Sequence, residues 1–355
     1  ADRLLTLATG QGQQPEFKGV RYADLSWADM DNDGDLDLVI TGMERNGTSL
    51  TRLYRNTDGI LLLDEVNSEA LINAHNGDLA WGDVDNDGDL DLALSGENII
   101  PEGGLYNVTE FYLNDPPGTL SLAANLVLID NDSGDPLQIR RGSLAWADYD
   151  EDGNLDLAVS GRDFEFNAVL KLYRNRPAGT LTEDSGFSMS STQRVDGALD
   201  WIDYDNDGDP DLAVTGRTKL SAHRAVVFDN RGGSVVGVSV EEDNLVGLSG
   251  GTALWADYSG DGRVDLLITG VDESGERRSL LYDNLGTPDA NRNPDSPRSL
   301  NPAKVTGSRV LFSWTAGEDV ESSILTYNIR IGTEEGLDDI LSSSVALGPG
   351  NTGFA

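Results

Sequence analysis

The chain has 355 residues with 62 acidic and 25 basic side chains, a formal net charge of −37 and no cysteine. This acidity argues against nucleic-acid binding, because nucleic acids are polyanions. The lack of cysteine excludes a disulfide framework and thiol chemistry, and since the sequence shows no long apolar run, no membrane insertion is expected.

The first predicted element is a short strand at Leu4–Ala8, and five similar units follow it. Each unit begins with a tryptophan, continues with carboxylates at alternate positions and a glycine, and ends in an apolar run. The tryptophans recur with a period of about 54 residues, which is typical of β-propellers and related repeat arrays. They are Trp27, Trp81, Trp146, Trp201 and Trp255.

The carboxylates of each unit form a loop that suits a hard cation. Counted from the acid two residues after the tryptophan, positions 1, 3, 5 and 9 offer side-chain oxygens, position 6 is glycine, and position 7 offers a backbone carbonyl. The predicted ligands are Asp29, Asp31, Asp33, Asp35 and Asp37; Asp83, Asp85, Asp87, Asp89 and Asp91; Asp148, Asp150, Asp152, Asn154 and Asp156; Asp203, Asp205, Asp207, Asp209 and Asp211; and Asp257, Ser259, Asp261, Arg263 and Asp265. The position-7 residues Asp35, Asp89, Asn154, Asp209 and Arg263 would coordinate through their backbone carbonyls.

A ligand set made only of oxygens favours Ca²⁺ over zinc or copper. An EF-hand is excluded because position 12 is apolar in every unit and because the residues that follow are typical of a strand. We therefore expect about five calcium sites. The fifth should be weakest, since Ser259 replaces an aspartate and Arg263 adds a positive charge. A metal-free acidic turn is the alternative, but five copies in register disfavour it, because closely packed carboxylates repel one another.

Four strands are expected in each unit: one leading into the tryptophan, one after the loop, one ending in an aromatic-x-Asn motif, and one after a short turn. The motifs are Tyr54-Arg55-Asn56, Tyr112-Leu113-Asn114, Tyr173-Arg174-Asn175, Phe228-Asp229-Asn230 and Tyr282-Asp283-Asn284. The second strand is apolar on both faces, which is typical of a blade packed between two neighbours. The sequence therefore predicts an all-β fold, a β-propeller of four-stranded blades, with the tryptophans in the core between blades. The five visible repeats form either a ring that Leu4–Ala8 closes by completing the last blade, or part of a larger ring.

Three regions are expected along the chain. Residues 1–285 hold the calcium-binding propeller, and residues 286–299, rich in proline, asparagine and aspartate, are typical of a linker. Residues 300–355 contain two alternating strands, Val310–Thr315 and Leu325–Ile331. Because a whole sandwich domain usually needs about 100 residues, we expect a partial β-sandwich there.

The Trp-x-Asp-x-Asp-x-Asp-Gly-x-x-Asp-Leu unit, with its later Tyr-x-Asn, resembles the FG-GAP (VCBS-type) repeat of integrin α-subunit propellers and of many secreted bacterial proteins. The resemblance covers residues 1–285 and implies propeller blades, most often in seven-bladed rings, with Ca²⁺ in the loop between the first two strands of each blade. Residues 300–355 are similar to the first half of a fibronectin type III domain, through Trp314 and Tyr327. Together these resemblances imply a secreted or surface-displayed bacterial protein.

No enzyme activity is expected, because the loops account for the paired carboxylates and the two histidines, His75 and His223, stand in unrelated contexts. Extracellular calcium modules typically bind with a Kd on the order of 10⁻⁴ to 10⁻³ M, which fits a location outside the cell or on its surface. We expect adhesion or ligand binding, to an extracellular glycan or protein, through the connections opposite the calcium loops: Met43–Leu50, Glu97–Glu110, Arg162–Asn167, Arg217–Arg224 and Val271–Arg278. The alternatives are a subunit that self-assembles into an extracellular filament or coat, and an accessory domain of a secreted polysaccharide-degrading enzyme.

Overall fold

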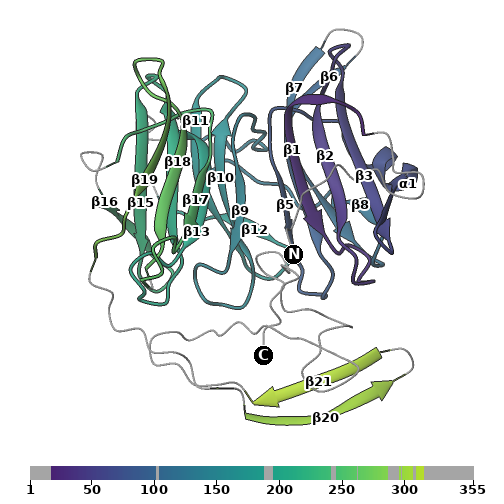
Figure 1. Ribbon diagram of the computed structural model, residues 1–355. Coiled ribbons are helices and arrows are strands. Elements are labelled where there is room, and N and C mark those ends of the chain that lie inside the picture. The colour runs from purple at the N-terminus through teal and green to yellow at the C-terminus, as the bar shows by residue number, and fades with distance from the viewer. Residues whose placement is uncertain are drawn as a thin grey trace, which may run out of the picture.

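A computed structural model of the chain describes residues 17–100, 104–187, 195–240, 245–261, 263–286, 296, 298–306 and 309–315. Five antiparallel sheets follow one another along this part of the chain and form the blades of a β-propeller. Figure 1 shows the blades standing side by side, from the purple sheet that begins with β1 to the green sheet that ends with β19. The prediction of an all-β propeller with five blades is confirmed.

Four blades have four described strands each, ordered from the inner strand outward. They are β1 (Val20–Ala28), β2 (Asp37–Glu44), β3 (Ser49–Thr57) and β4 (Ile60–Asp64); β5 (Leu79–Gly82), β6 (Asp91–Ile100), β7 (Gly104–Asn114) and β8 (Leu120–Leu122); β9 (Leu144–Ala147), β10 (Asp156–Arg162), β11 (Ala168–Asn175) and β12 (Leu181–Glu183); and β13 (Val195–Ile202), β14 (Asp211–Thr218), β15 (His223–Asn230) and β16 (Val235–Val240).

The fifth blade has three described strands, β17 (Ala253–Ala256), β18 (Asp265–Val271) and β19 (Arg277–Tyr282). The strand expected to complete it, Leu4–Ala8, lies outside the described residues. The described part of the chain holds one helix, α1 (Glu65–Ala70), which Asp64 caps by accepting a hydrogen bond from the Asn67 amide at 3.0 Å. No helix in these residues is long and apolar enough to cross a membrane.

The same register recurs in all five blades. A leucine of the second strand lies between the tryptophan of the first strand and the aromatic residue of the third, as Leu157 lies between Trp146 and Tyr173. The corresponding leucines are Leu38, Leu92, Leu212 and Leu266. In the third blade the second strand is buried on both faces, as predicted, because this blade packs between two others: Leu157, Ala158 and Val159 are fully buried.

The tryptophans pack between blades only where a preceding blade is described. Trp81 and Trp146 are 5% exposed, and the Trp146 indole nitrogen donates to the Ala80 carbonyl of the preceding blade at 3.4 Å. Trp27 of the first blade is 47% exposed. The expectation of a core role is therefore confirmed for Trp81 and Trp146 and is wrong for Trp27.

One expected connection turns out to consist mostly of paired strands. The residues Glu97–Glu110 were expected as a long loop, but most of them extend β6 and β7, which pair from Glu97 opposite Asn107 to Ile100 opposite Gly104. Beyond the propeller, β20 (Arg298–Thr306) pairs with β21 (Arg309–Thr315), and the last two residues of the predicted linker 286–299 belong to β20. The second expected sandwich strand, Leu325–Ile331, lies outside the described residues.

Candidate metal sites

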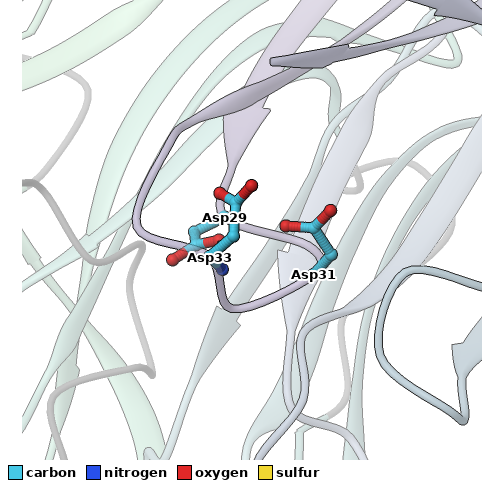
Figure 2. A group of neighbouring side chains, drawn as sticks. All are labelled: Asp29, Asp31 and Asp33. Carbon is cyan, nitrogen blue, oxygen red and sulfur yellow. Dashed lines mark hydrogen bonds between the residues drawn. The ribbon is translucent and has the colours of Figure 1, made fainter. Parts of the chain in front are cut away.

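Each acidic loop joins the first strand of a blade to the second and is organised by its position-1 aspartate. In the first loop the Asp29 carboxylate accepts hydrogen bonds from the amides of Asp33 and Gly34, both at 3.0 Å. Gly34 has φ = +96°, a left-handed conformation that favours glycine. The same two bonds recur at Asp83, Asp148 and Asp203. Figure 2 shows Asp29, Asp31 and Asp33 gathered at the loop.

The first four loops each bring three carboxylate oxygens within 4.8 Å of one another. The groups are Asp29, Asp31 and Asp33; Asp83, Asp85 and Asp91; Asp148, Asp150 and Asp156; and Asp203, Asp205 and Asp211. A further group consists of Asp205, Asp207 and Asp229. In the described part of the fifth loop, which lacks residue 262, no such group forms among Asp257, Asp261 and Asp265.

One oxygen is left without a hydrogen-bond partner at the same place in four loops. It is the buried Oδ1 of the position-3 aspartate, in Asp31, Asp85, Asp150 and Asp205. A buried carboxylate oxygen without a partner is costly, and a cation would satisfy it. The donor set, carboxylate oxygens with neither sulfur nor imidazole, fits a hard divalent ion such as Ca²⁺. The first four loops therefore have the chemistry of metal sites.

The position-9 aspartates also fasten the loop to the third strand, a role that the sequence analysis missed. Asp156, which is fully buried, accepts a hydrogen bond from the Asn175 amide at 2.8 Å. Asp37, Asp91, Asp211 and Asp265 make the same bond to their own aromatic-x-Asn asparagines. Burial, followed by the neighbouring carboxylates, raises the pKa of Asp156 to about 8 and that of Asp91 to about 7. A bound cation would favour the ionised forms instead.

The side chains at position 7 link neighbouring loops or their own blade. The Asn32 side chain donates to Asp89 Oδ1 of the second loop at 2.6 Å, and Asn86 donates to Asn154 Oδ1 of the third at 2.7 Å. Asp35 accepts a hydrogen bond from the Asp58 amide at 2.6 Å. These side chains are therefore engaged elsewhere, which is consistent with the prediction that position 7 offers its backbone carbonyl.

A cavity of about 920 Å³ lies at the opposite end of the blades, where the first strands begin, and residues from all five blades line it. Glu97 accepts a hydrogen bond from the Asn76 side chain at 2.8 Å and forms a buried ion pair with Arg140. Arg141 and Arg217 also line the cavity. The sequence could not reveal it, because its walls come from residues between Tyr22 and Gly251.

The fold and the site together define a class of protein: a β-propeller built from repeats, with an acidic candidate metal loop between the first two strands of each blade. Residues 29–94 and 148–214 match the FG-GAP-like repeat family, so the chain contains FG-GAP-like repeats. No curated protein matches the chain. A solved structure described as a glycoside hydrolase is similar at 12% identity and a TM-score of 0.31, over 78% of this chain and 93% of that one. A likeness this weak carries no argument about activity.

Proposed function

We propose that the protein is a calcium-stabilised, non-catalytic adhesion or ligand-binding module that works outside the cell or on a bacterial surface. The observation that carries the calcium part is the buried Oδ1 without a partner at position 3 of four loops, Asp31, Asp85, Asp150 and Asp205. Millimolar calcium outside cells would fill sites with a Kd on the order of 10⁻⁴ to 10⁻³ M, whereas cytosolic calcium would leave them empty.

The ligand, a glycan or a protein, would bind at the axial cavity. This end of the blades is free of the acidic loops, and on a chain with a net charge of −37 it gathers Arg140, Arg141 and Arg217. Arg140 is committed to Glu97, whereas Arg141 and Arg217 form no ion pair with a described residue. Two guanidinium groups facing an open cavity suit the carboxylate or sulfate of an acidic ligand.

A repeated contact supports the absence of catalysis. Ser49 Oγ lies 2.9 Å from His75 Nδ1, and Glu97 approaches the other ring nitrogen at 3.5 Å, an arrangement that resembles a hydrolytic triad. However, the serine hydroxyl already accepts a hydrogen bond from the Ile99 amide at 3.0 Å. An equivalent bond with the two residue types exchanged joins His223 to Ser249 at 2.9 Å. A contact that occurs in both orientations between neighbouring blades is better explained as a structural link.

A glycan array tests this function, with the protein in millimolar calcium and again in chelator. We expect binding to glycans that carry uronic acid or sulfate. The variants Arg141→Ala and Arg217→Ala should lose this binding. The control Arg45→Ala, which removes an exposed arginine from the turn between β2 and β3, should keep it. A folded protein that binds no glycan would move the proposal to protein ligands or self-assembly. Turnover of a bound polysaccharide would contradict the non-catalytic assignment.

A further inference from the structure

The middle residue of the aromatic-x-Asn motif lies beside the position-3 aspartate of its own blade. In the first blade this residue is Arg55, whose Nη1 forms an ion pair with Asp31 Oδ2. Its Nη2 donates to Asp64 Oδ2 at 3.0 Å and to the Gly118 carbonyl of the second blade at 2.7 Å. One guanidinium group therefore joins the first loop, its own outer strand and the next blade.

The third blade repeats these contacts, and a second arginine, Arg176, also pairs with Asp150 Oδ2, at 2.9 Å. Arg174 Nη1 donates to Asp150 Oδ2 at 2.6 Å, and Nη2 donates to Asp184 Oδ2 at 3.1 Å. Nη2 also donates to the Gly233 carbonyl of the fourth blade at 2.6 Å. In both blades the arginine takes the outer oxygen of the position-3 carboxylate and leaves the buried Oδ1 without a partner.

In the second and fourth blades the middle residue of the motif is not a cation. In the second blade Leu113 replaces the arginine and Ala123 replaces the outer-strand aspartate. Ala123 corresponds to Asp184, because its amide donates to the Phe111 carbonyl just as the Asp184 amide donates to the Leu172 carbonyl. Leu113 and Ala123 both pack against an apolar cluster. In the fourth blade Asp229 stands at this place, with an oxygen within 4.8 Å of oxygens of Asp205 and Asp207. The second loop thus gains no cation from this position, and the fourth gains a carboxylate, Asp229, that pairs with the exposed Arg231 at 2.6 Å.

We propose that Arg55 and Arg174 act as built-in counter-ions, so that the first and third loops keep their shape without calcium while the second and fourth loops depend on it. This inference rests on the calcium binding proposed above. A guanidinium group next to the carboxylates offsets their mutual repulsion in the metal-free state, and it repels a divalent cation at the same site. Calcium therefore fills the second and fourth loops before the first and third.

The consequence extends to the contacts between blades. Arg55 ties the first blade to the second through Gly118, and Arg174 ties the third to the fourth through Gly233. Leu113 makes no equivalent tie between the second blade and the third, and Asp229 makes none between the fourth blade and the fifth. Without calcium, the arginine ties add to the contacts of the first blade with the second and of the third with the fourth, whereas the second and third blades are joined without such a tie.

Amide hydrogen exchange of the whole chain, in millimolar calcium and in chelator, tests this proposal loop by loop. On chelation we expect protection to fall about tenfold or more in residues 83–91 and 203–211, and by no more than about twofold in residues 29–37 and 148–156. An equal response of all four loops would overturn the counter-ion proposal while leaving calcium binding intact. No response in any loop would overturn both.

Exchanging the side chains between blades gives a second test. Arg55→Leu should make the first loop as sensitive to chelator as the second loop. In the third loop the same result requires Arg174→Leu together with Arg176→Leu, because Arg176 also pairs with Asp150. Arg45→Leu is the charge-matched control. The double change Leu113→Arg with Ala123→Asp should make residues 83–91 insensitive. If the leucine variants lose protection equally with and without calcium, the arginines are only structural and the proposal is wrong.

Discussion

Asn175 of the third blade donates its side-chain amide to the carbonyl oxygen of Val84 in the acidic loop of the second blade, at 2.7 Å. Val84 occupies position 2 of its loop, between the candidate ligands Asp83 and Asp85. The same bond joins Asn114 to Met30, Asn230 to Tyr149, and Asn284 to Tyr204. Each candidate metal site is therefore held from the following blade, which couples the loops to the packing of the ring.

Replacing this asparagine should destabilise the protein. Asn175→Ala removes the bond to Val84 and the bond that Asn175 Oδ1 accepts from the Thr180 amide at 3.0 Å, leaving buried groups without partners. We expect a loss of about 2–4 kcal/mol in the free energy of unfolding, measured by denaturant titration. The exposed Asn46→Ala serves as the control and should change it by less than about 0.5 kcal/mol.

Calcium removal should lower the melting temperature substantially. Asp85→Asn keeps the shape of the second loop but removes the charge of its position-3 ligand, so it should reduce the difference in melting temperature between calcium and chelator. Ser259→Ala, in the fifth loop, should change this difference little. Differential scanning calorimetry with and without chelator checks this, and a melting temperature that chelator does not move would rule out structural calcium.

The stabilisation by calcium should grow with pH. Burial raises the pKa of Asp156 to about 8 in the metal-free protein, against about 3.9 for an ordinary aspartate. Because the folded pKa is the higher one, this group stabilises the metal-free fold fully below about pH 4, and the contribution is lost as the pH rises to about 8. The melting temperature in chelator should therefore fall over this range, while calcium, which holds the ionised form, should prevent the fall. Asp156→Asn should flatten the profile in chelator; an unchanged profile would contradict this assignment.

A pair of carboxyl groups away from the loops should also make the melting temperature fall as the pH rises. Asp24 and Asp78 are hydrogen-bonded to each other, and each accepts an amide from the next blade, Leu79 at 2.9 Å and Leu144 at 2.7 Å. Burial, with the charge of Asp24, raises the pKa of Asp78 well above its usual range. Asp78→Asn keeps an acceptor without the charge, so it should raise the melting temperature at pH 8 by a few degrees and much less at pH 4. Glu69→Gln, an exposed change on α1, should have no effect at either pH.

Two of the three cavity arginines, Arg140 and Arg141, should separate into a structural and a binding residue. Arg140 is 5% exposed and neutralises the buried Glu97, so Arg140→Ala should cost about 3–5 kcal/mol of stability. Arg141 is exposed and has no such partner, so Arg141→Ala should leave the unfolding transition unchanged. Equal losses in urea titrations would show that both residues are structural.

The repeats made the local structure predictable. An apolar strand after each loop and an aromatic-x-Asn motif in every unit were enough to predict the blades and the convergence of Asp83 with Asp85. What lies between blades was not predictable from the spacing. The contact of Arg55 with Asp31 and Gly118 depends on how two sheets pack, and the axial cavity depends on the order of all five. The double role of Asp156 was hidden because a buried acid that accepts amide bonds has the same place in the sequence as a metal ligand.

The bonds from Asn114, Asn175, Asn230 and Asn284 all point in one direction along the chain, from a later blade to an earlier loop, across 80 to 91 residues. On a ribosome, the newest loop is therefore made well before the asparagine that secures it. The last loop made therefore lacks its asparagine bond until the next blade has been synthesised and has packed against it. Maturation of the candidate metal sites thus trails synthesis by one blade.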